Sequence, residues 1–253
     1  MTTLLFNGVP GAFRLRSAVV LATPGLLAGQ APGDVDRSLV IEADPRALRG
    51  QQDPASLLCA LAARELAAAD PAGADPFSRG VFISTRSGNQ RSVRAFAGAL
   101  AAGRRSPSTF SAAGYNIVAQ SVARELGAKG PSVVLAGRRA TLDGALFLAA
   151  LRLGSGAITT GYAGHCTWLP DASLRGGEGL AVLTAVTLTG TPATGAQHGV
   201  VRLVPRELYG PSELHRPDAG PAGPRRTPAA EDLAAVRRVA PVIHGGRVPV
   251  AAP

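Results

Sequence analysis

The chain has 253 residues, 46% of them hydrophobic, and is long enough to bury a sizeable core. Its net charge of +9 admits nucleic-acid binding, but aromatic residues make up only 4% and do not alternate with arginines as single-strand binding surfaces require. Lysine occurs once among the 26 basic residues, which indicates a GC-rich genome as one source of the arginine content. An acidic protein or an anionic thioester carrier therefore suits this charge better than nucleic acid.

The first part of the chain alternates short apolar runs with glycine and proline. The apolar runs lie at 17–22 and 38–41 and predict short strands, and the glycine and proline residues between them predict loops. Asp53 and Pro54 are an N-cap and a first-turn proline for a helix that ends near Ala69. Cys59 lies inside this helix, where a buried apolar thiol is expected.

Strands alternate with helices over the middle of the chain. Strands are predicted at 81–84, 133–136, 157–162, 180–188 and 200–204, and helices at 113–126 and 142–153. This alternation predicts a layered α/β sheet covered by helices on both faces. The turn at 85–89 opens another helix, and its lone glycine argues against phosphate binding.

Proline and glycine dominate the chain after Arg216 and cannot build a core. A short helix is predicted at 231–239, and the last dozen residues are expected to be disordered. The predicted organisation is one domain over residues 1–212, followed by a largely disordered tail over residues 213–253.

Neither a disulfide framework, a zinc site nor a membrane segment is indicated. Cys59 and Cys166 are too few for a disulfide framework and form no zinc-binding spacing with histidines, so we expect a reducing compartment and no metal. The first residues lack a basic segment followed by an apolar stretch, and no window approaches the roughly 20 apolar residues of a membrane span. These features predict a soluble, cytoplasmic protein.

Five stretches of the sequence, taken in order, resemble one known family. They are 81–89, 106–124, 127–132, the turn at Arg139 with Leu142 and Asp143, and 177–183. Together they resemble the N-terminal half of the β-ketoacyl synthases of the thiolase superfamily, and the chain-length factors of type II polyketide synthases look most similar. The resemblance covers about residues 15–212 and implies a thiolase-like layered α/β fold, N-terminal half only.

The resemblance implies a cysteine nucleophile where this chain has Arg139. In active members that cysteine lies on a turn between strand and helix, where the helix N-terminus lowers its pKa and stabilises the oxyanion. An arginine stays protonated at neutral pH and cannot attack a thioester. Chain-length factors usually carry glutamine there, so Arg139 departs from them as well. We interpret Arg139 as an interface or solvated cation in preference to one that holds a carboxylate or oxyanion.

Active ketosynthases also use two histidines from their C-terminal half. His198, His215 and His244 of this chain lie in no matching motif. The resemblance therefore implies a subunit without catalytic residues or cofactor, which forms a heterodimer with a full-length ketosynthase and contacts an acyl carrier protein. Such a partner would cover the apolar surface that a missing half leaves open.

Chain-length factors place bulky aromatic residues near the end of the acyl tunnel, after a Ser-Pro pair. The matching residues here are Ser111, Ala112, Ala113, Gly114 and Tyr115. Their mostly small side chains imply an open tunnel and a longer or differently bent acyl chain. Helix packing explains alanine and glycine equally well.

Two alternatives remain at this point. Cys166 with His165, in a predicted loop after the 157–162 strand, could serve an acyltransferase or thioester hydrolase, although no orienting acid is evident. Asp143 and Glu178 do not read as a catalytic acid pair. The other alternative is a non-enzymatic scaffold that keeps the fold without acyl chemistry.

Overall fold

The computed structural model describes the body of the chain and a few residues of the tail. Described are residues 3–5, 9, 11–28, 39–44, 48, 53–69, 75–86, 88–104, 107–137, 140–170, 177–188, 199–200, 236, 239 and 240. The strands are β1 (Thr3–Leu5), β2 (Phe13–Ala22), β3 (Ile41–Glu42), β4 (Arg79–Thr85), β5 (Ser132–Ala136), β6 (Thr160–Pro170), β7 (Gly177–Leu188) and β8 (Gly199–Val200). The helices are α1 (Pro24–Ala28), α2 (Pro54–Ala69), α3 (Gln90–Ala101), α4 (Pro107–Ala113), α5 (Ile117–Glu125) and α6 (Leu142–Gly154), with a 3-10 helix at Pro76–Ser78.

The described strands form one mixed sheet. Its order is β5-β4-β6-β7-β2-β1-β8, with β3 beside β2 in the eight-stranded sheet. β4 is parallel to both β5 and β6, whereas β7 runs antiparallel to β6 and to β2. Helices connect the parallel strands, as crossover connections require.

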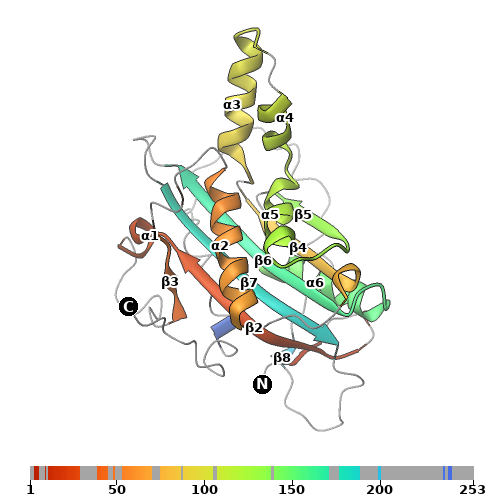
Figure 1. The fold of residues 1–253 in the computed structure, drawn as a ribbon. Coiled ribbons are helices and arrows are strands. Elements are labelled where there is room, and N and C mark those ends of the chain that lie inside the picture. The colour runs from red at the N-terminus through yellow and green to blue at the C-terminus, as the bar shows by residue number, and fades with distance from the viewer. Residues whose placement is uncertain are drawn as a thin grey trace, which may run out of the picture.

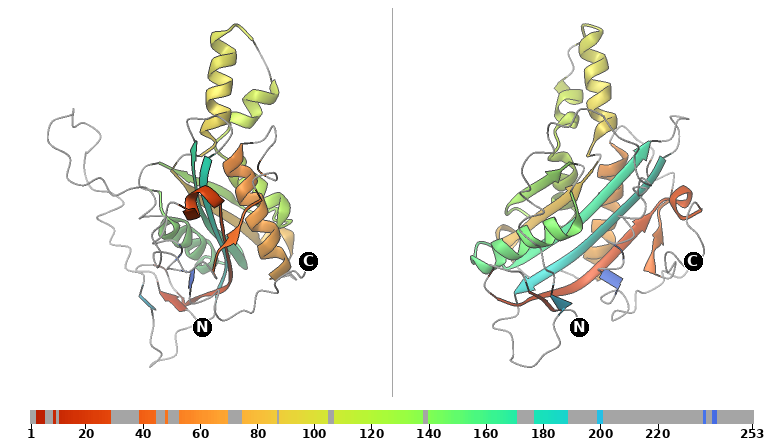
Figure 2. Two further views of the ribbon diagram at one scale, coloured as in Figure 1. Left: turned by 90° about the vertical axis from the view of Figure 1, so that its left-hand side faces the viewer. Right: turned by 180° about the vertical axis from the view of Figure 1, so that it is seen from behind.

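Helices cover both faces of this sheet. α2 and α5 lie on one face, and α6 lies on the other (Figures 1 and 2). Alternate residues of β4 serve the two sides: Phe82 packs with the α6 cluster, and Val81 and Ile83 pack with the α2 and α5 cluster. The predicted α/β sheet with helices on both faces is confirmed.

The helix boundaries follow local chemistry. α2 begins at Pro54 with Asp53 as its cap, because the Asp53 carboxylate accepts from Ala55 N at 3.0 Å, as predicted. The single helix predicted over 113–126 is wrong at its start. α4 ends at Ala113, and a non-helical segment that starts at Gly114 separates it from α5, which begins at Ile117.

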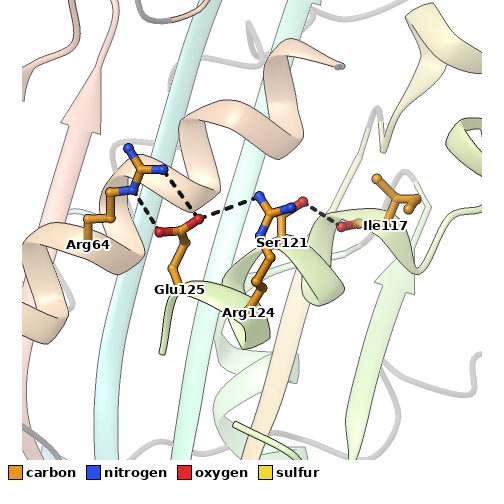
Figure 3. A network of polar contacts seen from close by, with 5 residues as sticks. All are labelled: Arg64, Ile117, Ser121, Arg124 and Glu125. Carbon is orange, nitrogen blue, oxygen red and sulfur yellow. Dashed lines mark hydrogen bonds and ion pairs between the residues drawn. The ribbon is translucent and has the colours of Figure 1, made fainter. Parts of the chain in front are cut away.

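A surface ion-pair network joins α2 to α5 (Figure 3). Glu125 Oε2 accepts from Arg64 Nε at 2.7 Å, and Glu125 Oε1 lies 3.5 Å from Arg124. The hydrogen bond from Arg64 is the main reason that the pKa of Glu125 lies below its ordinary value. Because Arg64 and Arg124 are largely exposed, this network aligns the two helices and adds little stability.

Three described residues of the tail reach the core. Val236, Val239 and Ala240 are helical, and Val236 and Val239 are buried in the cluster that contains α6. The remaining tail lies outside the described residues, so the predicted division at residue 212 stays a prediction. Within the part of the chain that the structure describes, no helix is both long and apolar enough to span a bilayer.

Candidate functional site

The turn between β5 and α6 contains the position at which the family resemblance implies a nucleophile. Gly137 has φ +146°, a conformation that favours glycine, and its N–H donates to Thr85 O at 3.1 Å. Ala140 N then donates to Gly137 O at 3.0 Å, and the Thr141 side chain caps the N-terminus of α6. The strand-to-helix turn is therefore present. Arg139 itself lies outside the described residues, and its interpretation stays a prediction.

A buried polar network lies on the α6 face of the sheet. His165 Nδ1 is 2.9 Å from Ser84 Oγ, and His165 Nε2 is 3.1 Å from Thr167 Oγ1. Ser84 Oγ also donates to Gly164 O at 3.1 Å, so the Ser84 hydroxyl links the imidazole to the backbone of β6. His165 is 3% exposed, and both hydroxyl groups are buried as well. The network is thus closed to solvent and satisfied on both ring nitrogens.

This network lies close below the turn. Ser84 pairs in register with Leu135, which precedes Gly137 by two residues, and His165 pairs with Ser84 on the other side. Sequence reasoning missed Ser84 and Thr167 as partners of His165. The signal was the two-residue period, because His165 and Thr167 must share a face once they lie in one strand.

The loop predicted around His165 and Cys166 is wrong: both residues lie within β6. Gly164 lies in β6, and this strand position requires glycine because a Cβ there would meet Leu183 Cδ1 and Val182 O, each at 2.8 Å. Close packing of β6 against β7 demands this glycine, which on sequence alone reads as a loop residue.

His165 and Cys166 point to opposite faces of the sheet. Cys166 is buried in the α2 and α5 cluster, and its Sγ contacts Ala55 O at 3.6 Å. The imidazole and the thiol therefore do not face each other, and the geometry gives no nucleophile–base dyad. Cys59 is also buried, as expected.

α3 and α4 project from the body as a helical arm (Figures 1 and 2). We use the word arm for α3, α4 and the residues up to Tyr115. The tunnel candidates Ser111, Ala112, Ala113, Gly114 and Tyr115 all lie in its last part. At the foot of the arm, Asn89 Nδ2 donates to Ala112 O at 2.6 Å and to Gly114 O at 3.0 Å. The five residues thus lie at the end of α4 and just after it, beside Asn89. Their role in lining a tunnel stays a prediction.

Asp53 ties the arm to the body. Besides capping α2, its carboxylate accepts from Ser92 N, in the first turn of α3, at 3.2 Å. Burial of Asp53 raises the pKa of its carboxyl above the ordinary value, although the hydrogen bonds from Ser92 and Ala55 and the charge of Arg91 oppose this rise. One buried carboxylate thus serves two helix N-termini.

The similarity of this chain to known proteins is found in their three-dimensional structures. No family model and no curated protein match the sequence. The solved ishigamide ketosynthase/chain length factor superposes with a TM-score of 0.51 at 18% identity, over 74% of this chain and 63% of that chain. A ketosynthase in complex with its chain length factor from Xenorhabdus doucetiae gives a TM-score of 0.49 at 16% identity, over 70% and 79%. This chain therefore spans less than two thirds of the ishigamide protein's chain.

The chain has a ketosynthase-like thiolase fold. The similarity confirms the predicted fold class. Within the described part of this ketosynthase-like fold, no group of three His, Cys, Asp or Glu side chains could hold a metal ion. His198, His215 and His244 lie outside the described residues.

The link between Asp53 and the arm predicts a pH effect on the ketosynthase-like fold. A raised pKa means that the folded chain binds this proton more tightly than the unfolded chain, so the contribution of Asp53 to stability falls as the pH rises above about 4. The Asp53→Asn variant stays neutral and lacks this dependence. Urea unfolding of both proteins between pH 4 and 7 should show the wild type losing stability relative to the variant. A wild-type stability that stays constant or rises relative to that of the variant as the pH increases would contradict the assignment.

Proposed function

We propose that this chain is a non-catalytic subunit that pairs with a full-length ketosynthase in polyketide or fatty-acyl biosynthesis, in the manner of a chain-length factor. It completes the acyl tunnel of the partner, offers a basic surface to an acyl carrier protein and works in the cytoplasm as part of a β-ketoacyl synthase complex. The observation that supports the proposal is in the sequence between β5 and α6, where Arg139 stands at the position at which the family resemblance implies a nucleophile.

The cysteines support a non-catalytic role. The two thiols of the chain, Cys59 and Cys166, are buried in the cluster on the α2 and α5 face of the sheet. Because both thiols are buried, a thioester substrate cannot reach them. Neither thiol can replace the missing nucleophile in this conformation.

The outer side of α6 supports a subunit partner. Leu142, Ala145 and Leu146 are buried against the sheet, but Leu151 is 42% exposed, and Phe147 is only partly buried on the same helix. A helix that is apolar on every side is normally covered on every side. A partner that packs on α6 would bury this remaining surface.

The edge of the sheet offers a second surface. β5 pairs with β4 alone among the described strands, and its residues Val133, Val134 and Leu135 are only partly buried. An apolar edge strand readily accepts another chain. β5 lies beside α5 at the side of the sheet (Figure 1), so a partner could contact the edge and the turn together.

Co-expression tests the pairing. The chain, tagged, should co-purify in a defined stoichiometry with the ketosynthase encoded nearest to its gene, and the pair should condense acyl units supplied by the acyl carrier protein. The isolated chain should show no condensation. A stable monomer that ignores every ketosynthase expressed with it would contradict the proposal.

The tunnel hypothesis makes a further prediction for the pair. Ala113 is partly buried at the foot of the arm, and Ala113→Trp should fill the space that a growing acyl chain would use. We expect products shorter by one or more extension units, measured by mass spectrometry of the released chains. Ala95→Trp, an exposed position on α3, is the matched control and should leave product length unchanged. Unchanged product length in Ala113→Trp would reject a tunnel role for this segment.

A further inference from the structure

Hydrogen bonds fix the foot of the arm, by which we mean the end at which α3 and α4 join the body. Thr85 Oγ1 accepts from Gly88 N at 2.8 Å, Asn89 holds the end of α4, and Asp53 holds the first turn of α3. Asn89 is fully buried, so these bonds are protected from water. The foot therefore presents the arm in one orientation without the presence of a partner.

Beyond its foot, the arm lacks a core of its own. Ser92 is the only buried residue of the twelve in α3. Phe96 and Phe110 pack against each other with ring centroids 5.5 Å apart, yet Phe110 remains 65% exposed. Leu100 is 51% exposed near the end of α3, and Tyr115 is 54% exposed at the foot. Large exposed apolar side chains on a projecting element are typical of an interface.

The charges of the arm have a single sign. Between Arg86 and Arg124 the sequence contains no aspartate and no glutamate, and every charged residue is an arginine. Among them, Arg91, Arg94 and Arg104 are exposed on or directly after α3. An apolar tip with a purely basic surround fits a complementary apolar groove with an acidic rim.

We infer that the arm inserts into an apolar groove with an acidic rim on the ketosynthase partner, an inference that rests on the proposed function. A second copy of this chain is a poor occupant, because each copy carries a net charge of +9 and an arm of the same sign. Charge on the arm thus selects a different, acidic chain. The preformed foot lowers the ordering entropy lost on insertion.

Charge reversal on the arm tests this inference. Arg94→Glu/Arg104→Glu should weaken binding to the co-expressed ketosynthase by about tenfold or more, and affinity of the wild-type pair should fall as salt rises. Leu100→Asp should weaken binding at every salt concentration. The control is Arg14→Glu/Arg16→Glu, which makes the same total charge change on two exposed residues of β2, a strand that lies away from the arm (Figure 1). Circular dichroism checks that each variant folds.

The outcomes separate the two proposals. If the pair forms and all arm variants bind like the wild type, the arm inference is overturned and the proposed function stands. If the wild-type chain binds no ketosynthase, both fail. If sedimentation shows a self-associated chain that the arm variants disrupt, the arm binds a second copy and the acidic partner is rejected.

Discussion

Replacing Leu146 by alanine is expected to lower the free energy of unfolding by about 2–5 kcal/mol, since it deletes a buried leucine from a packed core. Leu146 is 1% exposed and lies on the inner side of α6, in the cluster that contains Phe82 of β4 and Val182 of β7. The loss of contacts and the remaining cavity both act on the folded state. Urea unfolding followed by circular dichroism measures the change.

Leu151→Ala on the same helix is the matched control. Leu151 is 42% exposed, so its truncation should change the stability of the isolated chain by no more than about 0.5 kcal/mol. The same change should weaken pairing with the ketosynthase, because the proposed interface covers that side of α6. Equal destabilisation by both substitutions in the isolated chain would show that α6 is already covered on its outer side.

The second large effect is expected at His165. His165→Ala removes the hydrogen bonds to Ser84 and Thr167 and leaves a void in the sheet face below α6. The expected destabilisation is about 2–4 kcal/mol, because polar groups that lose a buried partner are not resolvated. Thermal and urea unfolding of the variant measure it.

Cys166→Ala is the control for His165, since the two residues are neighbours on opposite faces of β6. The Cys166→Ala substitution removes a buried sulfur atom from a largely apolar cluster. We expect it to lower the free energy of unfolding by only about 1 kcal/mol. If the cysteine variant loses as much stability as the histidine variant, the polar network adds nothing beyond packing. The pair of measurements therefore isolates the value of the network.

Local signals in the sequence predicted much of the fold. Asp53 and Pro54 marked the start of α2, and the apolar spacing from Leu142 to Leu153 marked α6, because caps and periodicity act within a few residues. The same reasoning failed at Gly164. Its glycine serves the contact of β6 with Leu183 on β7, and that contact is between residues distant in the sequence.

For the candidate site too, some features could be predicted from the sequence and others required the structure. The sequence by itself determined the α/β class, the strand-to-helix turn and the presence of arginine at position 139, since these depend on local pattern and residue identity. Only the tertiary structure decided that His165 and Cys166 point apart, that Ser84 meets His165, and that α3 and α4 stand out from the body. The physical reason is that strand pairing and helix packing join residues about 80 positions apart, and no local propensity encodes which side of a sheet they will share.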